Sequence, residues 1–283
     1  MSSIDSTSTT SSQISIHPKS TSSSVSHHLI YYITGNPGLI GYYNTFLQSL
    51  HPLLGASDPQ SVILIGHSVG SYILLELIKR LGKSSPVKIK AGILLFPTIT
   101  HIAKSPSGAR LSTLFRIPNF PRKAGTVAKA LVLLTPTNAL RWLVGLVTRM
   151  PREAAEVTTS FLRSRMGVWQ ALHMAKDEMD IITEDRWDDN IWGAEHEDLD
   201  TKSETPKLIF YFGQNDHWVA DHTRDALIAA RGREEGARKS SKPVMLIDNS
   251  GIPHGFCIRH SETVAEKVGL WINELMADTR RRW

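Results

Sequence analysis

The feature that most constrains the fold of this chain is the pentapeptide Gly66-His67-Ser68-Val69-Gly70. It follows directly on an apolar, largely β-branched run, residues 62–65, and it precedes residues 71–81, where apolar side chains recur at helical spacing. A G-x-S-x-G motif between a strand and a helix is typical of a sharp turn that exposes a serine nucleophile. We expect Gly66 and Gly70 to lie where the helix packs on the strand with no room for a Cβ atom.

A serine nucleophile needs a base and an acid, and in folds with this turn the order along the chain is serine, acid, histidine. A predicted strand at 207–212 ends in a turn with Asp216, and the loop after a second strand, 243–247, carries His254. Ser68 would attack an acyl carbonyl, His254 would transfer the proton, and Asp216 would orient the imidazole. The alternative is that Asp216 caps a turn and His254 is one surface histidine among twelve. Less well placed candidates are Asp221 and Asp248 for the acid and His217, His222 and His260 for the base.

Stabilisation of a negatively charged acyl oxygen would come from backbone N–H groups near the nucleophile. The loop Thr34-Gly35-Asn36-Pro37-Gly38 follows a predicted strand at 28–33 and is the expected source of one of them. We predict the N–H groups of Asn36 and Val69 as the donors, because Pro37 has none. An ordinary turn at the end of a strand is the alternative.

Several segments together resemble the lipid droplet-associated hydrolase family. They are TGNPGLIGYY at 34–43, LIGHSVGSY at 64–72, LFPTI at 95–99, YFGQNDHWV at 211–219 and HGF at 254–256. The resemblance implies an α/β-hydrolase fold, with a mostly parallel sheet flanked by helices, a triad of Ser68, Asp216 and His254, attachment to lipid droplets, and hydrolysis of lipid esters. Family members commonly begin the first segment with proline, where this chain has Thr34.

The segment between the first loop and the nucleophile is short for this fold. Only 30 positions separate Gly38 from Ser68, enough for one helix at about 42–54, a linker at 55–60 and the strand before the nucleophile. A further strand and helix would not fit, because a parallel crossover needs a dozen or more residues. We therefore expect a missing strand–helix unit, as a gap in the sheet beside the nucleophile strand or as a segment lost from the coding sequence. Such a gap would displace the oxyanion loop.

Composition fits one globular domain at 27–283, since 283 residues with 41% hydrophobic residues can bury a sizeable core. Residues 1–26 are mostly serine and threonine and are expected to be a disordered tail. The single cysteine, Cys257, excludes an internal disulfide and suits a reducing compartment. Neither a metal-ligand set nor a dinucleotide fingerprint is found, so no metal and no cofactor is expected. The basic residues are scattered, which argues against nucleic acid.

A long insertion, about 100–203, separates two predicted core strands and is expected to form a helical lid with a lipid-contacting part. Within it, residues 124–150 form two apolar helical segments that are interrupted by Pro136 and by charges, so a membrane-spanning helix is disfavoured. The pattern fits either a helical hairpin lying in a lipid surface or two helices packed on the hydrolase core, and the family resemblance favours the first. Acidic residues between 178 and 189 are expected to form solvated lid surface. The predicted lipid-contacting side chains are Leu140, Trp142, Leu143 and Val147.

The sequence therefore predicts a serine hydrolase of carboxylic lipid esters that acts through an acyl-enzyme in lipid storage or turnover. The alternative is a weakly active or inactive protein of the same fold that binds or organises lipid droplets. Expected partners are a neutral lipid ester as substrate and the lipid droplet monolayer, and the net charge of +5 suits an anionic lipid surface. The lipid droplet is the expected location, with the endoplasmic reticulum surface and the cytosol as further ones.

Overall fold

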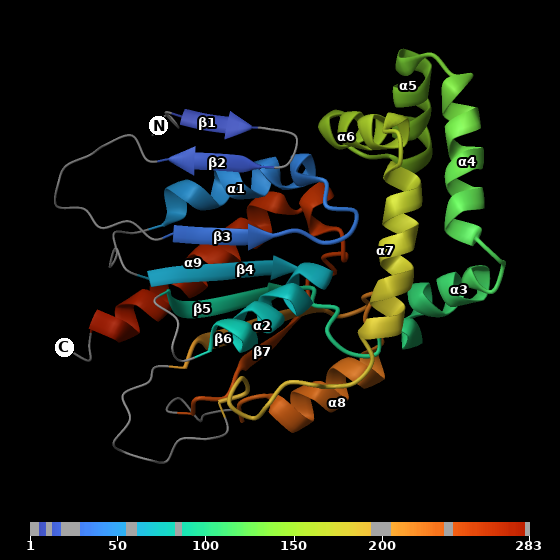
Figure 1. The fold of residues 1–283 in the computed structure, drawn as a ribbon. Helices are drawn as coiled ribbons and strands as arrows, with labels where there is room; N and C mark the ends of the chain where they lie inside the picture. The colour runs from blue at the N-terminus through green and yellow to red at the C-terminus, as the bar shows by residue number, and fades with distance from the viewer. Residues whose placement is uncertain are drawn as a thin grey trace.

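The computed structural model describes residues 6–9, 13–17, 29–54, 61–82, 87–193, 205–234 and 240–280. Its centre is a five-stranded sheet in which neighbouring strands follow the chain order and every pair is parallel (Figure 1). The strands are β3 (Leu29–Ile33), β4 (Ser61–His67), β5 (Lys88–Leu95), β6 (Lys207–Gly213) and β7 (Val244–Asp248). The flanking helices are α1 (Asn44–Leu50), α2 (Val69–Leu81), α8 (Asp221–Arg231) and α9 (Ser261–Arg280). The predicted parallel sheet flanked by helices is confirmed.

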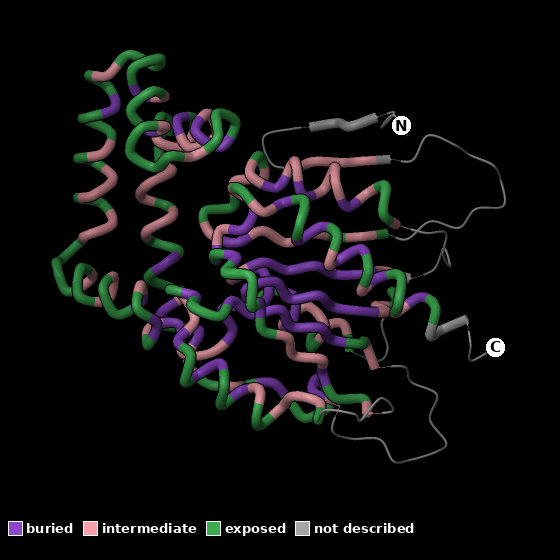
Figure 2. The backbone as a smooth tube through the Cα atoms, turned by 180° about the vertical axis from the view of Figure 1, so that it is seen from behind, coloured by how far each residue is buried: buried purple, intermediate pink, exposed green. Residues whose placement is uncertain are grey.

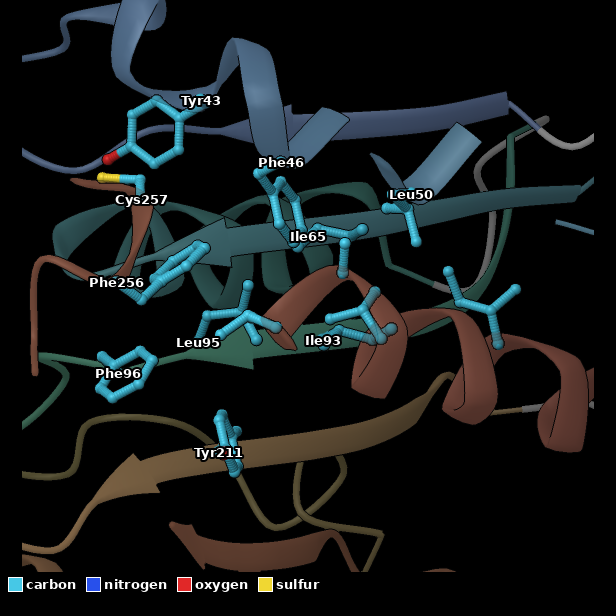
Figure 3. Close-up of a cluster of buried hydrophobic side chains, with 14 of the residues drawn as sticks. Tyr43, Phe46, Leu50, Ile65, Ile93, Leu95, Phe96, Tyr211, Phe256 and Cys257 are labelled. Atoms are coloured by element: carbon cyan, nitrogen blue, oxygen red, sulfur yellow. The ribbon is translucent and has the colours of Figure 1, made fainter. Parts of the chain in front are cut away.

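Strand residues alternate between the two faces of the sheet, because successive side chains of a strand point in opposite directions. Ile63 and Ile65 of β4 belong to a buried cluster with residues of α1 and α9, whereas Leu64 belongs to a cluster on the other face with residues of α2 and α8. Figure 3 shows the first of these clusters, in which Phe46 and Leu50 of α1 lie over the sheet. Figure 2 shows that the strands are the most deeply buried part of the chain. Burial on both faces explains why these strands are apolar runs without polar alternation.

The expected gap beside the nucleophile strand is absent. β3 pairs directly with β4, with register from Leu29 opposite Val62 to Ile33 opposite Gly66. The connection through α1 and the 3₁₀ turns Ile40–Tyr43 and His51–Leu53 is long enough for a parallel crossover between adjacent strands. Among the described residues β3 is an edge strand, and the nucleophile strand β4 is paired with a neighbour on each side.

Part of the serine- and threonine-rich tail forms regular structure, which differs from the disorder expected for residues 1–26. β1 (Ser6–Thr9) and β2 (Ile14–His17) form an antiparallel pair, and β2 contacts α1. Ile14 and Ile16 alternate with polar residues, and β-branched residues favour strands. The remainder of this segment lies outside the described residues.

In the described part of the chain five helices lie between β5 and β6, in the insertion predicted to form a lid, and we call them the lid helices. Figure 1 shows them beyond the carboxyl ends of β3 and β4, with α4 and α7 side by side. They fall within the insertion predicted at about 100–203, and the predicted hairpin corresponds to α4 and α5. The lid helices are α3 (Pro106–Phe115), α4 (Phe120–Leu133), α5 (Thr137–Thr148), α6 (Arg152–Arg163) and α7 (Gly167–Ile181).

The close approach of α2 to β3 predicts that a single methyl group at position 70 destabilises the protein. A Cβ atom on Gly70 would lie 2.3 Å from the carbonyl oxygen of Ile33 and 2.7 Å from that of Thr34, both rigid backbone atoms. We expect Gly70→Ala to lower the free energy of unfolding by about 2–3 kcal/mol in urea titrations, as an overpacked site does.

The matched control is Gly145→Ala within α5, where a Cβ atom meets nothing within 4 Å. Alanine in an open helix interior should stabilise the protein by up to about 1 kcal/mol. Equal unfolding free energies for the two variants would contradict the packing argument.

Candidate active site

Ser68 lies in the turn between β4 and α2 with φ 55° and ψ −126°, a conformation that non-glycine residues rarely adopt. Its N–H donates to the carbonyl of Leu95 at 3.0 Å, and its own carbonyl accepts the N–H of Ser71 at 2.9 Å. A Cβ atom on Gly66 would lie 2.6 Å from the Gly70 carbonyl oxygen, so both glycines are required by close packing, as expected. The surrounding structure therefore holds a strained turn that presents the Ser68 hydroxyl.

The structure brings Ser68, His254 and Asp216 into one hydrogen-bonded chain. The Ser68 Oγ lies 2.9 Å from the His254 Nε2, and the His254 Nδ1 lies 2.7 Å from the Asp216 Oδ2. The imidazole and the carboxylate are buried, whereas Ser68 is partly exposed. Because a carboxylate oxygen accepts, Nδ1 carries the proton and Nε2 is free to accept one from the serine. This is the geometry of an activated nucleophile with an oriented base.

A buried arginine supports the loop that carries the acid. The guanidinium of Arg224 donates to the carbonyl oxygens of Gly213 and Gln214 at 3.0 and 2.9 Å. Asp216 in turn accepts the N–H of Trp218 through its other carboxylate oxygen at 2.8 Å. Sequence reasoning missed Arg224; a basic residue on the inner face of a helix directly after the acid loop was the available signal.

The alternative acids have structural partners instead. Asp248 accepts the hydroxyl of Tyr211 at 2.6 Å and the N–H groups of Ser250 and Ile252 at 3.1 and 2.8 Å, which shapes the loop before the histidine. Burial alone would raise the pKa of Asp248, but these hydrogen bonds lower it overall. Asp221 is exposed and pairs with Arg224 at 2.7 Å.

The alternative bases make no hydrogen bond to Ser68 or Asp216 in the described part of the chain. The ring centroid of His217 lies 5.9 Å from that of His254, and the His217 Nδ1 lies 2.9 Å from the hydroxyl of Ser107. Burial and the neighbouring His254 lower the pKa of His217. His222 lies within α8 and His260 directly precedes α9.

The predicted oxyanion loop packs directly on the nucleophile. A Cβ atom on Gly35 would lie 2.8 Å from the Ser68 Cβ, and the N–H of Gly38 closes the turn on the Gly35 carbonyl at 2.7 Å. Over the described residues, no hydrogen bond engages the backbone N–H of Asn36 or of Val69. Two such N–H groups beside a serine are what an oxyanion hole requires.

The lid reaches this loop through α7. The Asn36 Nδ2 donates to the Ala171 carbonyl at 2.9 Å, and the side chain of Glu178 lies beside Asn36. Among the described residues, the buried Asn36 Oδ1 and Glu178 Oε1 have no hydrogen-bond partner. Burial raises the pKa of Glu178 to about 7, with Asp177 adding to the shift and Asn36 opposing it. Glu178 is thus not the solvated lid residue that the sequence predicted, because its turn of α7 faces the core.

Glu178 predicts a pH-dependent loss of stability. Its folded pKa lies above its unfolded value, so the folded state holds the proton more tightly and stability falls as pH rises from about 4.5 to about 7. Glu178→Gln should remove this term, and its unfolding free energy relative to wild type should rise by about 1–3 kcal/mol between pH 5 and pH 8. Glu266→Gln, which makes the same change at an exposed carboxyl of α9, is the control. Parallel pH profiles for wild type and Glu178→Gln would refute the assignment.

The predicted lipid-contacting residues divide into two groups. Leu140 is only 6% exposed and packs with Val132, Val144 and Ala155, so its assignment to lipid contact is wrong. Trp142, Leu143 and Val147 are 68%, 45% and 74% exposed. The helical period explains the division, because Leu140 and Val144 share the face of α5 that packs on α6.

Further exposed apolar residues lie in the same predicted hairpin. We define the lid patch as the exposed apolar side chains of α4, its end and α5: Val127, Leu131, Leu133, Leu134, Trp142, Leu143, Leu146 and Val147. A concentration of exposed large apolar side chains on two consecutive helices marks an interaction surface. No helix in the described ranges is long and apolar enough to cross a membrane. No group of residues suited to bind a metal ion occurs in these ranges either.

The parallel sheet, the strained serine turn after β4 and the helical lid before β6 define an α/β-hydrolase. Among solved structures, a haloalkane dehalogenase, DatA from Agrobacterium tumefaciens, shares the fold with a TM-score of 0.56 and 12% identity over 88% of this chain and 90% of that one. An epoxide hydrolase from Vigna radiata has a TM-score of 0.50 and 14% identity over 88% and 92%. At these identities the likeness concerns the fold alone.

The chain belongs to the Lipid-droplet associated hydrolase family, whose sequence profile matches residues 54–257. Two relatives named Lipid droplet-associated hydrolase are each 25% identical to it. The protein from Gallus gallus aligns over 86% of this chain and 83% of its own length, and that from Rattus norvegicus over 87% and 85%. The family resemblance seen in the sequence is thereby confirmed.

Proposed function

We propose that this hydrolase cleaves carboxylic lipid esters through an acyl-enzyme on Ser68. The observation that carries the proposal is the hydrogen-bonded chain from the Ser68 Oγ to His254 at 2.9 Å and from His254 to Asp216 at 2.7 Å. The unengaged N–H groups of Asn36 and Val69, in described backbone beside the serine, support it. The family name supports a lipid as the substrate.

The proposed reaction has two halves. The Ser68 oxygen attacks the ester carbonyl while its proton passes to the His254 Nε2, and the negative oxygen accepts the N–H groups of Asn36 and Val69. His254 then gives the proton to the departing alcohol, which leaves an acyl group on Ser68. In the second half His254 takes a proton from water, the hydroxide attacks the acyl carbon, and Ser68 recovers its proton as the acid leaves. Asp216 stabilises the imidazolium in both halves.

A fluorophosphonate probe tests the nucleophile, because it labels only an activated serine. We expect labelling of the wild-type protein, no labelling and no ester turnover in Ser68→Ala, and turnover reduced by about 10⁴ in Asp216→Asn, where the imidazole loses its orientation. Ser160→Ala, an exposed serine of α6, is the control and should behave as wild type.

Unchanged ester turnover in Ser68→Ala would overturn the proposal. A folded wild-type protein that coats droplets but is never labelled would instead support the alternative, an inactive protein of this fold that organises droplets.

We propose further that the lid patch docks on the lipid droplet monolayer. Helices α3–α6 and their connections, residues 106–163, contain nine basic and two acidic residues, although the whole chain has a net charge of only +5. The basic residues are Arg110, Arg116, Arg122, Lys123, Lys129, Arg141, Arg149, Arg152 and Arg163, and the acidic ones are Glu153 and Glu156. Apolar side chains that enter a monolayer and basic side chains that meet anionic headgroups are the two components of interfacial binding.

The size of the lid patch suits stable docking. Transfer of its large side chains into the monolayer, at about 1.5 kcal/mol each, gives on the order of 10 kcal/mol before ordering costs. Trp142 would lie at the interface, because an indole combines a large apolar surface with one polar N–H.

Two charges in the lid patch should release the protein from droplets. We expect Leu143→Asp with Val147→Asp to move a fluorescent fusion from droplets to the cytosol, because both exposed side chains would carry charge into the monolayer, while fluorophosphonate labelling persists. The matched control is Ile73→Asp with Leu270→Asp, which changes two exposed apolar residues of α2 and α9 outside the lid. If the lid variant still coats droplets, the docking surface lies elsewhere.

A further inference from the structure

His67, the residue before the nucleophile, is a buried polar side chain with a hydrogen bond at each ring nitrogen. Its Nδ1 lies 2.7 Å from the hydroxyl oxygen of Tyr43, and its Nε2 lies 2.9 Å from the backbone carbonyl oxygen of His254. Phe256 packs edge-on against the same ring at 5.1 Å between centroids. A buried imidazole in an aromatic surrounding is tolerated only when its nitrogen atoms have partners.

The two hydrogen-bond partners of His67 determine which of its ring nitrogens carries the proton. A carbonyl oxygen only accepts, so the His67 Nε2 carries the hydrogen that is directed at His254. In a neutral ring Nδ1 is then an acceptor, and the Tyr43 hydroxyl donates to it. The Tyr43 oxygen in turn accepts the backbone N–H of Gly35 at 3.3 Å. The result is a directed chain from Gly35 through Tyr43 and His67 to the His254 carbonyl.

This chain connects three loops of the candidate active site that are far apart in the sequence. Gly35 directly precedes Asn36 in the oxyanion loop, His67 directly precedes Ser68, and the last acceptor is the backbone of His254 itself. We propose that Tyr43 and His67 are positioning residues that fix the oxyanion loop and the backbone of His254 relative to the nucleophile. The inference rests on the proposed serine hydrolase function.

The charge state of His67 suits this role. Burial, followed by the neighbouring His254, lowers the pKa of His67 to about 3, so the ring is neutral at physiological pH. The titratable groups around the chain are Tyr32, Tyr42, Cys257, His254 and Asp216. Burial raises the pKa of Tyr43 and raises that of Cys257 to about 12, so both keep their protons. A neutral neighbour 5.2 Å from the His254 ring does not oppose the imidazolium that forms during the reaction.

Figure 3 shows the Tyr43 hydroxyl and the Cys257 sulfur directed toward each other at one end of the buried cluster. Tyr43 itself is a core residue, with its ring 5.0 Å from that of Tyr32. Phenylalanine would fill the same space, so packing alone does not require the hydroxyl. Tyr43→Phe therefore separates the positioning role of the oxygen atom from the structural role of the ring.

The test compares Tyr43→Phe with Tyr42→Phe, whose hydroxyl contacts Thr158 at 2.7 Å and has no part in the chain. We expect kcat for a soluble ester to fall about tenfold to a hundredfold in Tyr43→Phe with KM within about twofold, because a misaligned oxyanion donor acts on the transition state. The fraction labelled by the fluorophosphonate at completion should stay at the wild-type level while its rate constant falls. Tyr42→Phe should keep wild-type values of both.

A merely structural role would give the opposite pattern, a smaller labelled fraction with an unchanged rate constant, and would overturn the proposal. His67→Asn removes the donor to His254 and adds a second test. If the chain acts as one unit, the double variant Tyr43→Phe/His67→Asn should lose much less activity than the product of the single losses. Independent, multiplying losses would also refute it.

A measurement on the wild-type protein remains decisive if these variants do not fold. NMR of ¹⁵N-labelled histidine should show an imidazole that is still largely neutral at pH 4 and carries its proton on Nε2. Charge on every histidine at pH 4, or a neutral ring with its proton on Nδ1, would overturn the proposal. A wild-type protein that is not labelled by the fluorophosphonate would refute the proposed function and leave this result for His67 unaffected.

Discussion

The active-site geometry depends on backbone-to-backbone packing between α2 and β3. Gly70 approaches the carbonyl groups of Ile33 and Thr34 so closely that a Cβ atom would lie 2.3 Å from the first oxygen. The same approach sets the Gly35 backbone against Ser68, with a Cβ atom there 2.8 Å from the Ser68 Cβ. Main-chain contacts therefore position the nucleophile and the oxyanion loop relative to each other. These contacts are possible because β3 pairs directly with β4. A strand inserted between them would separate the two.

The parts of the site that sequence reasoning located share one property, which is their place at the ends of parallel strands. Ser68 follows β4, Asp216 follows β6 and His254 follows β7, and the carboxyl ends of parallel strands meet at one edge of a sheet. Apolar runs and turn residues identify such strand ends in the chain, so the residues of the hydrogen-bonded chain could be named before their distances were known. The chemical roles of Ser68, Asp216 and His254 belong to the proposed function.

Sequence reasoning missed the features that depend on which face of a helix packs against the rest of the protein. Leu140 and Trp142 lie two positions apart on α5, yet only the tertiary arrangement of α5 and α6 decides that the first is buried. Glu178 lies in an acidic segment, and only the docking of α7 on Asn36 takes it from water. The prediction of a gap beside β4 was wrong for a related reason. A count of residues between Gly38 and Ser68 does not show which strands of the sheet pair with each other.

The buried polar side chains of the site differ in whether their atoms have hydrogen-bond partners. The His67 ring nitrogens and the Asp216 and Asp248 carboxylates all have partners, so the three strand-end loops are held by satisfied hydrogen bonds. Across the described residues, Asn36 Oδ1 and Glu178 Oε1 are unpartnered acceptors where the lid meets the oxyanion loop. Burial favours the acid form of Glu178 because it removes the carboxylate from water, and the neighbouring Asn36 opposes this shift. The contact between α7 and the oxyanion loop therefore includes a partly buried carboxyl whose pKa lies near 7. Because α7 packs along α4 and also holds Asn36, one helix contacts both a helix of the lid patch and the oxyanion loop.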